Sequence, residues 1–202
     1  MKLILARHGE TDWNRDNRIQ GHSDIGLNER GKEQARCLAS QLKEEIITAI
    51  YTSPLRRAWE TALTIAEFHQ LPVQVEPDLA ELDVGEMDGL TFEQMRNKYG
   101  DILREWVRDA GPVKMPQGES LEELQGRAWA AIQRMLQKHP EGTVIVVSHN
   151  FAISTIICQA IGLALCDFRK LGLSVASISM LDLTERGGAR LMLLNDTCHL
   201  NR

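Results

Sequence analysis

Two histidines stand where strand-like segments of this sequence end. The apolar run 3–6 leads directly into Arg7 and His8, and the apolar run 144–147 leads, after one serine, to His149. In an open α/β sheet, ligands bind beyond the carboxyl ends of the parallel strands, so both imidazoles are expected in one crevice. Arg7 indicates an anionic ligand there, because a guanidinium is always charged and its donors match phosphate or carboxylate oxygens.

Further reactive side chains follow the other two predicted parallel strands. Ser53 and Arg57 come after the segment 49–51, and Glu81 lies in the acidic loop after 73–75. Arginines and the amides of a helix N-terminus would neutralise a phosphate. One histidine could then attack the phosphorus, while the other stabilises charge on the transferring oxygens and a carboxylic acid protonates the leaving alcohol. This set of residue types predicts phosphoryl transfer.

The elements that must position these groups alternate along the chain. Besides the four strand-like runs, helices are expected at 28–44, 54–68, 120–138 and from His149 to about 161. Such alternation is typical of βαβ units and a mostly parallel sheet. Ser53 before Pro54 indicates a helix start, with proline at the first helical position.

The remaining segments add an insertion and a hairpin to this framework. Residues 91–117 are expected to form short helices and a loop, as a lid inserted over the sheet edge at about 90–118 within one domain spanning 1–202. The segments 174–183 and 189–194 flank a glycine pair, which predicts an antiparallel hairpin.

Composition limits the classes of protein to consider. With 202 residues, 43% hydrophobic and 25% charged, the chain can bury one sizeable core. Its net charge of -5 argues against an extended nucleic-acid surface, although a local arginine cluster can still bind a small anion. Four scattered cysteines favour reduced thiols, and no signal peptide or apolar run of about 20 residues is found. We therefore expect a cytoplasmic enzyme with no membrane partner, either a monomer or a homodimer.

Several short motifs occur in a fixed order. They are Arg7-His8-Gly9-Glu10-Thr11 with Trp13, Asn14, Arg18, Gln20 and Gly21; Thr52-Ser53-Pro54-Leu55 with Arg57, Ala58, Thr61 and Ala62; Glu81-Leu82-Asp83 with Gly85 and Gly89; Gly118-Glu119-Ser120; and Ser148-His149. In these motifs the chain resembles the histidine phosphatase superfamily, in its phosphoglycerate mutase-like branch, over essentially its full length. The resemblance implies an α/β fold, a three-layer α/β/α sandwich on a mainly parallel sheet of about six strands.

The resemblance also implies roles for individual residues. His8 is expected to be the nucleophile that becomes phosphohistidine, and Arg7, Arg57 and His149 to complete the phosphate pocket. Glu81 is expected to donate a proton to the leaving group and then to act as base for water. The implied activity is hydrolysis of small phosphomonoesters without a metal or any other cofactor.

Three further positions match the family less directly. Asn14 and Gln20 fall where relatives reach toward the phosphate or the substrate. Asn150 stands where the family usually has glycine after the second histidine. Asparagine tolerates a left-handed backbone better than most residues, so the Asn150 amide is expected to face the phosphate still.

Alternatives remain for the function. His8, His149 and Glu81 could be metal ligands, but Arg7 and Arg57 would repel a divalent cation. A phosphoryl-binding module without turnover would lack the nucleophile or the acid, and both are present. A cofactor-dependent phosphoglycerate mutase would carry a longer basic cover than residues 90–118 provide, which favours a phosphatase. The remaining histidines, assigned to ordinary packing or turns, are His22, His69, His139 and His199.

Overall fold

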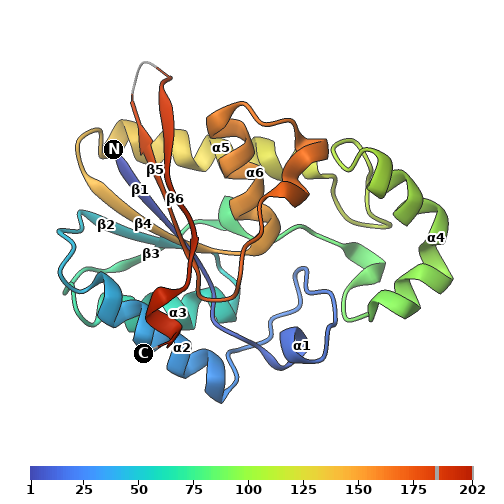
Figure 1. The fold of residues 1–202 in the computed structure, drawn as a ribbon, viewed down its shortest axis with the longest axis horizontal. Coiled ribbons are helices and arrows are strands. Elements are labelled where there is room, and N and C mark those ends of the chain that lie inside the picture. Colours follow the sequence, from blue (N-terminus) through green and yellow to red (C-terminus); the bar gives the residue numbers. More distant parts are fainter. Residues whose placement is uncertain (185–186, 202) are drawn as a thin grey trace.

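A six-stranded sheet forms the centre of the protein. The computed structural model describes residues 1–184 and 187–201, with strand order β3-β2-β4-β1-β5-β6 (Figure 1). The strands are β1 (Lys2–Arg7), β2 (Ala49–Thr52), β3 (Val73–Val75), β4 (Thr143–Ser148), β5 (Ile178–Leu183) and β6 (Ala189–Asp196). The first four pair in parallel, whereas β5 and β6 are antiparallel. The expected mainly parallel sheet and terminal hairpin are confirmed.

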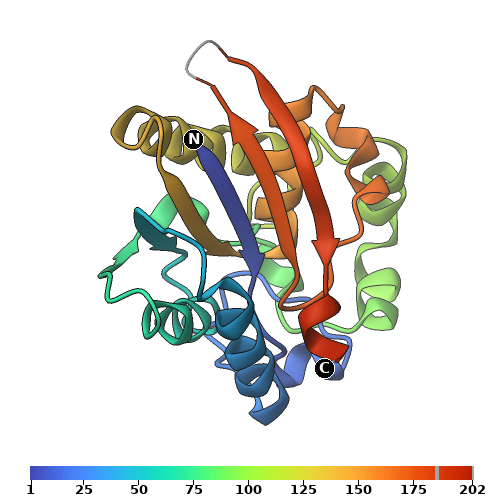
Figure 2. The ribbon, with the colours of Figure 1, turned by 60° about the vertical axis from the view of Figure 1, so that its left-hand side comes forward.

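Helices cover both faces of this sheet (Figure 2). They are α1 (Asp12–Arg15), α2 (Glu29–Leu42), α3 (Arg56–Ala66), α4 (Phe92–Arg108), α5 (Leu121–Lys138) and α6 (Asn150–Ile161), with short 3₁₀ helices at Pro77–Leu79, Gly85–Met87, Leu165–Lys170 and Cys198–Asn201. Ile4 packs in a core with α2 and α3, while Leu3 and Leu5 pack in a core with α5 and α6. Both sides of β1 are therefore buried, which explains its continuous apolar sequence. The three-layer α/β/α sandwich is confirmed.

Two predicted boundaries were wrong. Helix α3 begins at Arg56, with Leu55 as its N-cap, so Pro54 is not its first helical residue. The Ser53 hydroxyl caps no helical residue; it accepts the Leu55 N–H, and Asp24 accepts the Arg56 N–H instead. The last hairpin begins at Ile178 and not at 174, because Ala176 has a positive φ of 53° that interrupts an extended strand.

Residues 90–118 contain one kinked helix where several short ones were expected. Helix α4 starts at a capping box formed by Thr91 and Gln94 and bends at Tyr99, whose φ and ψ of -127° and 30° are not helical. The loop that follows leads to the capping box of Ser120 and Glu123 at the start of α5, as predicted. None of the described helices is long and apolar enough to cross a membrane.

Candidate active site

His8 follows β1 at the carboxyl edge of the sheet. Its backbone is held on both sides, since its N–H donates to the Ser148 carbonyl and its carbonyl accepts from Ala176. The ring is buried, and Nδ1 donates to the Gly9 carbonyl oxygen at 2.7 Å. Burial above all, then the charges of Arg57 and Arg7, hold the pKa of His8 well below its usual value. The ring is thus neutral with its proton on Nδ1, which leaves the Nε2 lone pair for nucleophilic attack.

His149 lies beside His8, with 5.1 Å between the ring centroids. It is the N-cap residue of α6 and is fully buried. Its Nδ1 accepts from Arg57 Nε at 3.2 Å, so in the neutral ring Nε2 donates to the Ser53 hydroxyl, at 2.7 Å. Burial, followed by the charge of Arg57, lowers the pKa of His149 well below its usual value. Ser53 therefore orients this imidazole. Sequence analysis placed Ser53 at this edge of the sheet but gave it no role beyond that of a helix cap.

Arg57 places a buried positive charge beside His149. Its side chain is completely buried, and its two Nη groups donate to the carbonyls of Ser23 and Gly21. Burial lowers the pKa of Arg57 to about 10, against the opposing effect of Glu81. The group is still a cation at neutral pH. A guanidinium has five donors, so three bonds to the protein leave capacity for phosphoryl oxygens.

Arg7 provides the second cation from the end of β1. It donates through Nη1 to the Leu173 carbonyl, and burial lowers its pKa from the usual value. Its Nε is buried and has no hydrogen-bond partner within residues 1–184 and 187–201. A buried N–H of this kind costs free energy unless it meets an acceptor, and a phosphoryl oxygen would supply one.

Glu81 reaches the site from the loop after β3. One carboxylate oxygen accepts from the backbone N–H groups of Leu82 and Ala152, and the other accepts from Phe151. The carboxylate thus sits on the N-terminus of α6, where the helix dipole favours negative charge. Burial nevertheless dominates and raises the pKa of Glu81 above its usual value. Such a carboxyl group can hold a proton near the leaving oxygen.

The loop that carries Glu81 is clamped from α5 by Arg127. This guanidinium donates to the carbonyl oxygens of Asp78, Ala80 and Glu81 and forms a two-point ion pair with Glu119. His22 donates to the same Glu81 carbonyl at 2.9 Å. Sequence analysis missed Arg127. The available signal was a lone arginine three residues after buried Leu124, on the apolar stripe of the predicted helix.

Asn14 and Gln20 are joined through Thr11. Asn14 Oδ1 accepts from the Thr11 backbone N–H, and Gln20 Oε1 accepts from the Thr11 hydroxyl. Thr11 is fully buried, whereas both amides are half-buried. With their oxygens turned to Thr11, each residue has its NH₂ group to offer to a ligand oxygen. Thr11 is the fixed point of this pair, a role that sequence analysis did not assign.

Asn150 is the first residue of α6 and follows His149 directly. It is half-buried, and it is absent from the residues with positive φ. Asn150 therefore does not have the left-handed backbone considered from the sequence, because a right-handed helix begins here. The next two N–H groups of α6 bind Glu81, which leaves the Asn150 N–H at the helix end as the donor for an anion.

Metal ligands do not gather within the described part of the chain: no group of three His, Cys, Asp or Glu side chains could hold an ion there. The fixed charges close to His8 and His149 are the guanidiniums of Arg7 and Arg57. Arg7 and Arg57 thus place two positive charges beside the two imidazoles.

A neutral buried imidazole, flanked by two guanidiniums and a carboxyl group of raised pKa, defines an enzyme of phosphoryl transfer. The model of the histidine phosphatase superfamily (branch 1) matches residues 3–197. The chain belongs to this superfamily. It is a phosphomonoesterase of the family.

Several relatives resemble this chain over nearly their full lengths. Phosphoserine phosphatase 1 of Hydrogenobacter thermophilus is 39% identical over 200 residues, covering 99% of this chain and 94% of that protein. Probable phosphoglycerate mutase GpmB of Cronobacter sakazakii is 35% identical over 182 residues, covering 90% and 85%. A phosphoserine phosphatase variant of Entamoeba histolytica, solved in complex with phosphoserine, superimposes with a TM-score of 0.87 at 31% identity, covering 98% of each chain.

Proposed function

We propose that the protein hydrolyses phosphomonoesters through a phosphohistidine formed on Nε2 of His8. The observation that carries this proposal is the hydrogen bond from His8 Nδ1 to the Gly9 carbonyl, which fixes the tautomer with a lone pair on Nε2. Nε2 forms a bond to phosphorus as the ester P–O bond breaks. Arg7, Arg57 and His149 stabilise the charge on the transferring oxygens.

Glu81 acts in both halves of this reaction. In the first half its carboxyl proton passes to the leaving oxygen, so the alcohol departs neutral. In the second half the Glu81 carboxylate takes a proton from water, whose oxygen attacks phosphorus while the N–P bond breaks. Asn14, Gln20 and the backbone N–H of Asn150 hold the phosphoryl oxygens or the substrate during both steps.

The reaction needs no metal and no organic cofactor, because the two guanidiniums supply the positive charge. The test is prolonged chelation followed by assay in metal-free buffer, with unchanged activity as the expected result. Activity that is lost and then restored by magnesium or zinc would assign His8, His149 and Glu81 to a metal site.

Trapping the intermediate tests the whole scheme. Rapid quench without acid, using labelled substrate, should show a phosphoryl group that is acid-labile and base-stable in the wild type and missing in His8→Ala. His8→Ala should also lose at least about 10⁴-fold in kcat, as expected for removal of a nucleophile. The control is His69→Ala, a half-buried histidine after α3, which should keep normal turnover. Normal turnover in His8→Ala would refute the assignment.

Mutase activity is the second candidate, favoured by the similarity to GpmB. Residues 90–118 form a single kinked helix and a loop and do not supply a dense basic cover for a second phosphate. Phosphate release should therefore exceed conversion of 3- to 2-phosphoglycerate, with and without 2,3-bisphosphoglycerate, in the same preparation. The opposite ratio would make the protein a mutase, and binding without either reaction would make it a non-catalytic module.

We also propose a cellular location, a domain organisation and a class of partner for the enzyme. We place it in the cytoplasm as one domain with residues 90–118 as its lid, with phosphomonoesters as its partners and neither nucleic acid nor membrane among them. Cell fractionation tests the location. Light scattering distinguishes a monomer from a homodimer.

A further inference from the structure

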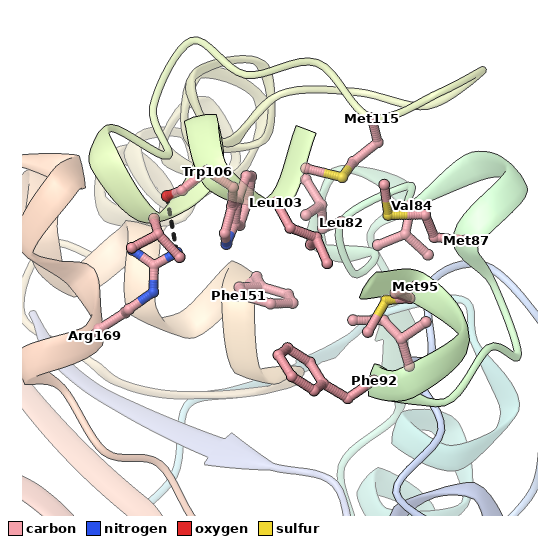
Figure 3. Close-up of a pocket in the computed structure, with 12 residues that line it drawn as sticks. Leu82, Val84, Met87, Phe92, Met95, Leu103, Trp106, Met115, Phe151 and Arg169 are labelled. Atoms are coloured by element: carbon pink, nitrogen blue, oxygen red, sulfur yellow. Dashed lines mark hydrogen bonds between the residues drawn. The ribbon is translucent and has the colours of Figure 1, made fainter. Parts of the chain in front are cut away.

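An apolar cavity of about 260 Å³ lies between α4 and the rest of the protein. Figure 3 shows side chains pointing into it, among them Leu82, Met95, Leu103, Trp106, Met115 and Phe151. Phe92 and Val107, at opposite ends of α4, also line the cavity and are 65% and 73% exposed. The cavity therefore opens to solvent beneath the helix.

Three wall residues are chain neighbours of the candidate active site. Leu82 directly follows Glu81, and the N–H of Phe151 is one of the donors to the Glu81 carboxylate. Ile19, on another segment, directly precedes Gln20. Because Glu81 must protonate the leaving oxygen, the alcohol departs on the Glu81 side of phosphorus. The cavity thus lies beside the loop and the helix start that hold the Glu81 carboxylate.

The walls offer hydrocarbon and almost no polar groups. Arg169 is the one charged side chain among the lining residues. It donates to the Trp106 carbonyl at 2.9 Å and lies over the rings of Phe168 and Trp106. Trp106 and Phe151 meet edge to face, with ring centroids 6.0 Å apart. This geometry is typical of a fixed aromatic wall.

The cavity is larger than an ordinary packing defect. Small-molecule sites are typically concave and mostly apolar with few polar groups, and the lining of this cavity has that character. An apolar cavity of about 150 Å³ in another protein binds benzene. A space of about 260 Å³ accommodates a hydrocarbon group of one or two rings.

We propose that this cavity binds the apolar, ring-bearing part of the substrate's alcohol, so that the enzyme prefers monophosphate esters of alcohols carrying such a group. The inference rests on the proposed phosphatase function and specifies its substrate class. An ammonium in this cavity would lose its water without gaining a partner from the hydrocarbon walls, and the charge of Arg169 would repel it. Phosphoserine, which carries an ammonium group close to its phosphate, is therefore expected to be a poor substrate.

The first test compares three esters whose leaving groups are all aliphatic alcohols. The purified wild-type enzyme is assayed with 2-phenylethyl phosphate, ethyl phosphate and phosphoserine, which keeps the chemistry of the leaving oxygen similar. We expect kcat/KM for 2-phenylethyl phosphate to exceed both others by at least about 10-fold, the usual minimum effect of filling an apolar pocket. Equal values, or a preference for phosphoserine, would overturn the inference.

The second test fills the cavity from the lid. Leu103→Trp places a larger apolar side chain at a half-buried wall position, and Leu63→Trp makes the same change at an exposed position on α3. We expect Leu103→Trp to remove most of the preference for 2-phenylethyl phosphate and to keep kcat/KM for ethyl phosphate within about threefold. Leu63→Trp should match the wild type with both esters. An unchanged preference in Leu103→Trp would contradict the inference.

A third variant guards against failure of Leu103→Trp to fold. Phe92 is mostly exposed, so Phe92→Ala can remove part of the wall with little effect on folding. Its preference for 2-phenylethyl phosphate should fall by about threefold or more, while thermal unfolding stays close to that of the wild type. An equal loss with all three esters would instead make Phe92 a general support of the site and refute its role in the cavity. Absence of activity with every ester in the wild type would refute the phosphatase function itself.

Discussion

The phosphate side and the leaving-group side of the catalytic centre consist of different kinds of side chain. On the phosphate side, His8, Arg57 and His149 are buried and tied to strand ends and neighbouring loops by hydrogen bonds. On the leaving-group side, α4 presents apolar side chains around a cavity and is linked to the 85–87 segment by bonds from Tyr99 and Lys98 to Glu86. The chemical step is thus set by a buried, charged and hydrogen-bonded region, while we expect the choice of alcohol to depend on a separate apolar one.

Glu81 lies between the two sides. The loss of activity on its removal should therefore depend strongly on the leaving group of the ester. Glu81→Gln should slow hydrolysis of an alkyl phosphate by about 10² to 10⁴, the usual effect of losing a general acid. An activated ester such as p-nitrophenyl phosphate should lose much less, because its leaving group needs no proton. Single-turnover phosphorylation of His8 with both esters measures the difference. Equal losses would assign Glu81 to the phosphate side as a charged or structural group.

The pH dependence of kcat/KM should distinguish the contribution of His8 from that of Glu81. His8 must be neutral, and its pKa is lowered below the usual 6.5, so activity is lost only at pH values below that pKa. Glu81 must carry a proton in the first step, and its pKa is raised above the usual 4.5, so activity falls as the pH rises through the raised value. We expect a bell-shaped profile of kcat/KM for alkyl phosphates, with limbs of about tenfold per pH unit.

The Glu81→Gln variant identifies the limbs of this profile. Glutamine does not titrate, so the alkaline limb should disappear while the acid limb remains. An alkaline limb that persists unchanged in Glu81→Gln would belong to another group, and the assignment of Glu81 as the acid would fail.

Substitution of Arg127 tests whether its hydrogen bonds to the 78–81 loop are needed to position Glu81. Arg127→Met removes the donors to three carbonyl oxygens and the partner of Glu119, and we expect about a 10-fold loss of kcat with alkyl phosphates from misplacement of Glu81. A shift of the alkaline limb should accompany the loss. The matched control is Arg134→Met on the same helix, where the arginine is half-exposed and pairs with Glu76 and Asp78. Loss of thermal stability without a shifted limb would make Arg127 structural only.

Residues that follow strands can be predicted from the sequence, whereas contacts between distant segments cannot. His8, Arg57 and His149 were found because each follows a strand within a few residues, and parallel strands bring their carboxyl ends to one edge. The contacts of Arg127 with the 78–81 loop span more than 40 positions, so no local pattern contains them. The cavity is harder still to predict from sequence. Apolar residues on α4 indicate packing against a core, and only the folded structure shows that a cavity lies between them.

The smallest effect is expected at Asn150, where the phosphate side departs from the usual family pattern. If its backbone N–H and not its side chain binds the phosphoryl group, Asn150→Gly keeps the donor and changes kcat/KM by less than about threefold for every ester. Glycine at the start of α6 should lower stability by no more than about 1 kcal/mol. The control is Asn150→Pro, which keeps a residue suited to the first helical position but removes the N–H. Asn150→Pro should lose activity with all three esters alike, because the phosphate is common to them. A large loss in Asn150→Gly that affects one ester alone would move Asn150 to the leaving-group side, and the division between the two sides would have to be redrawn there.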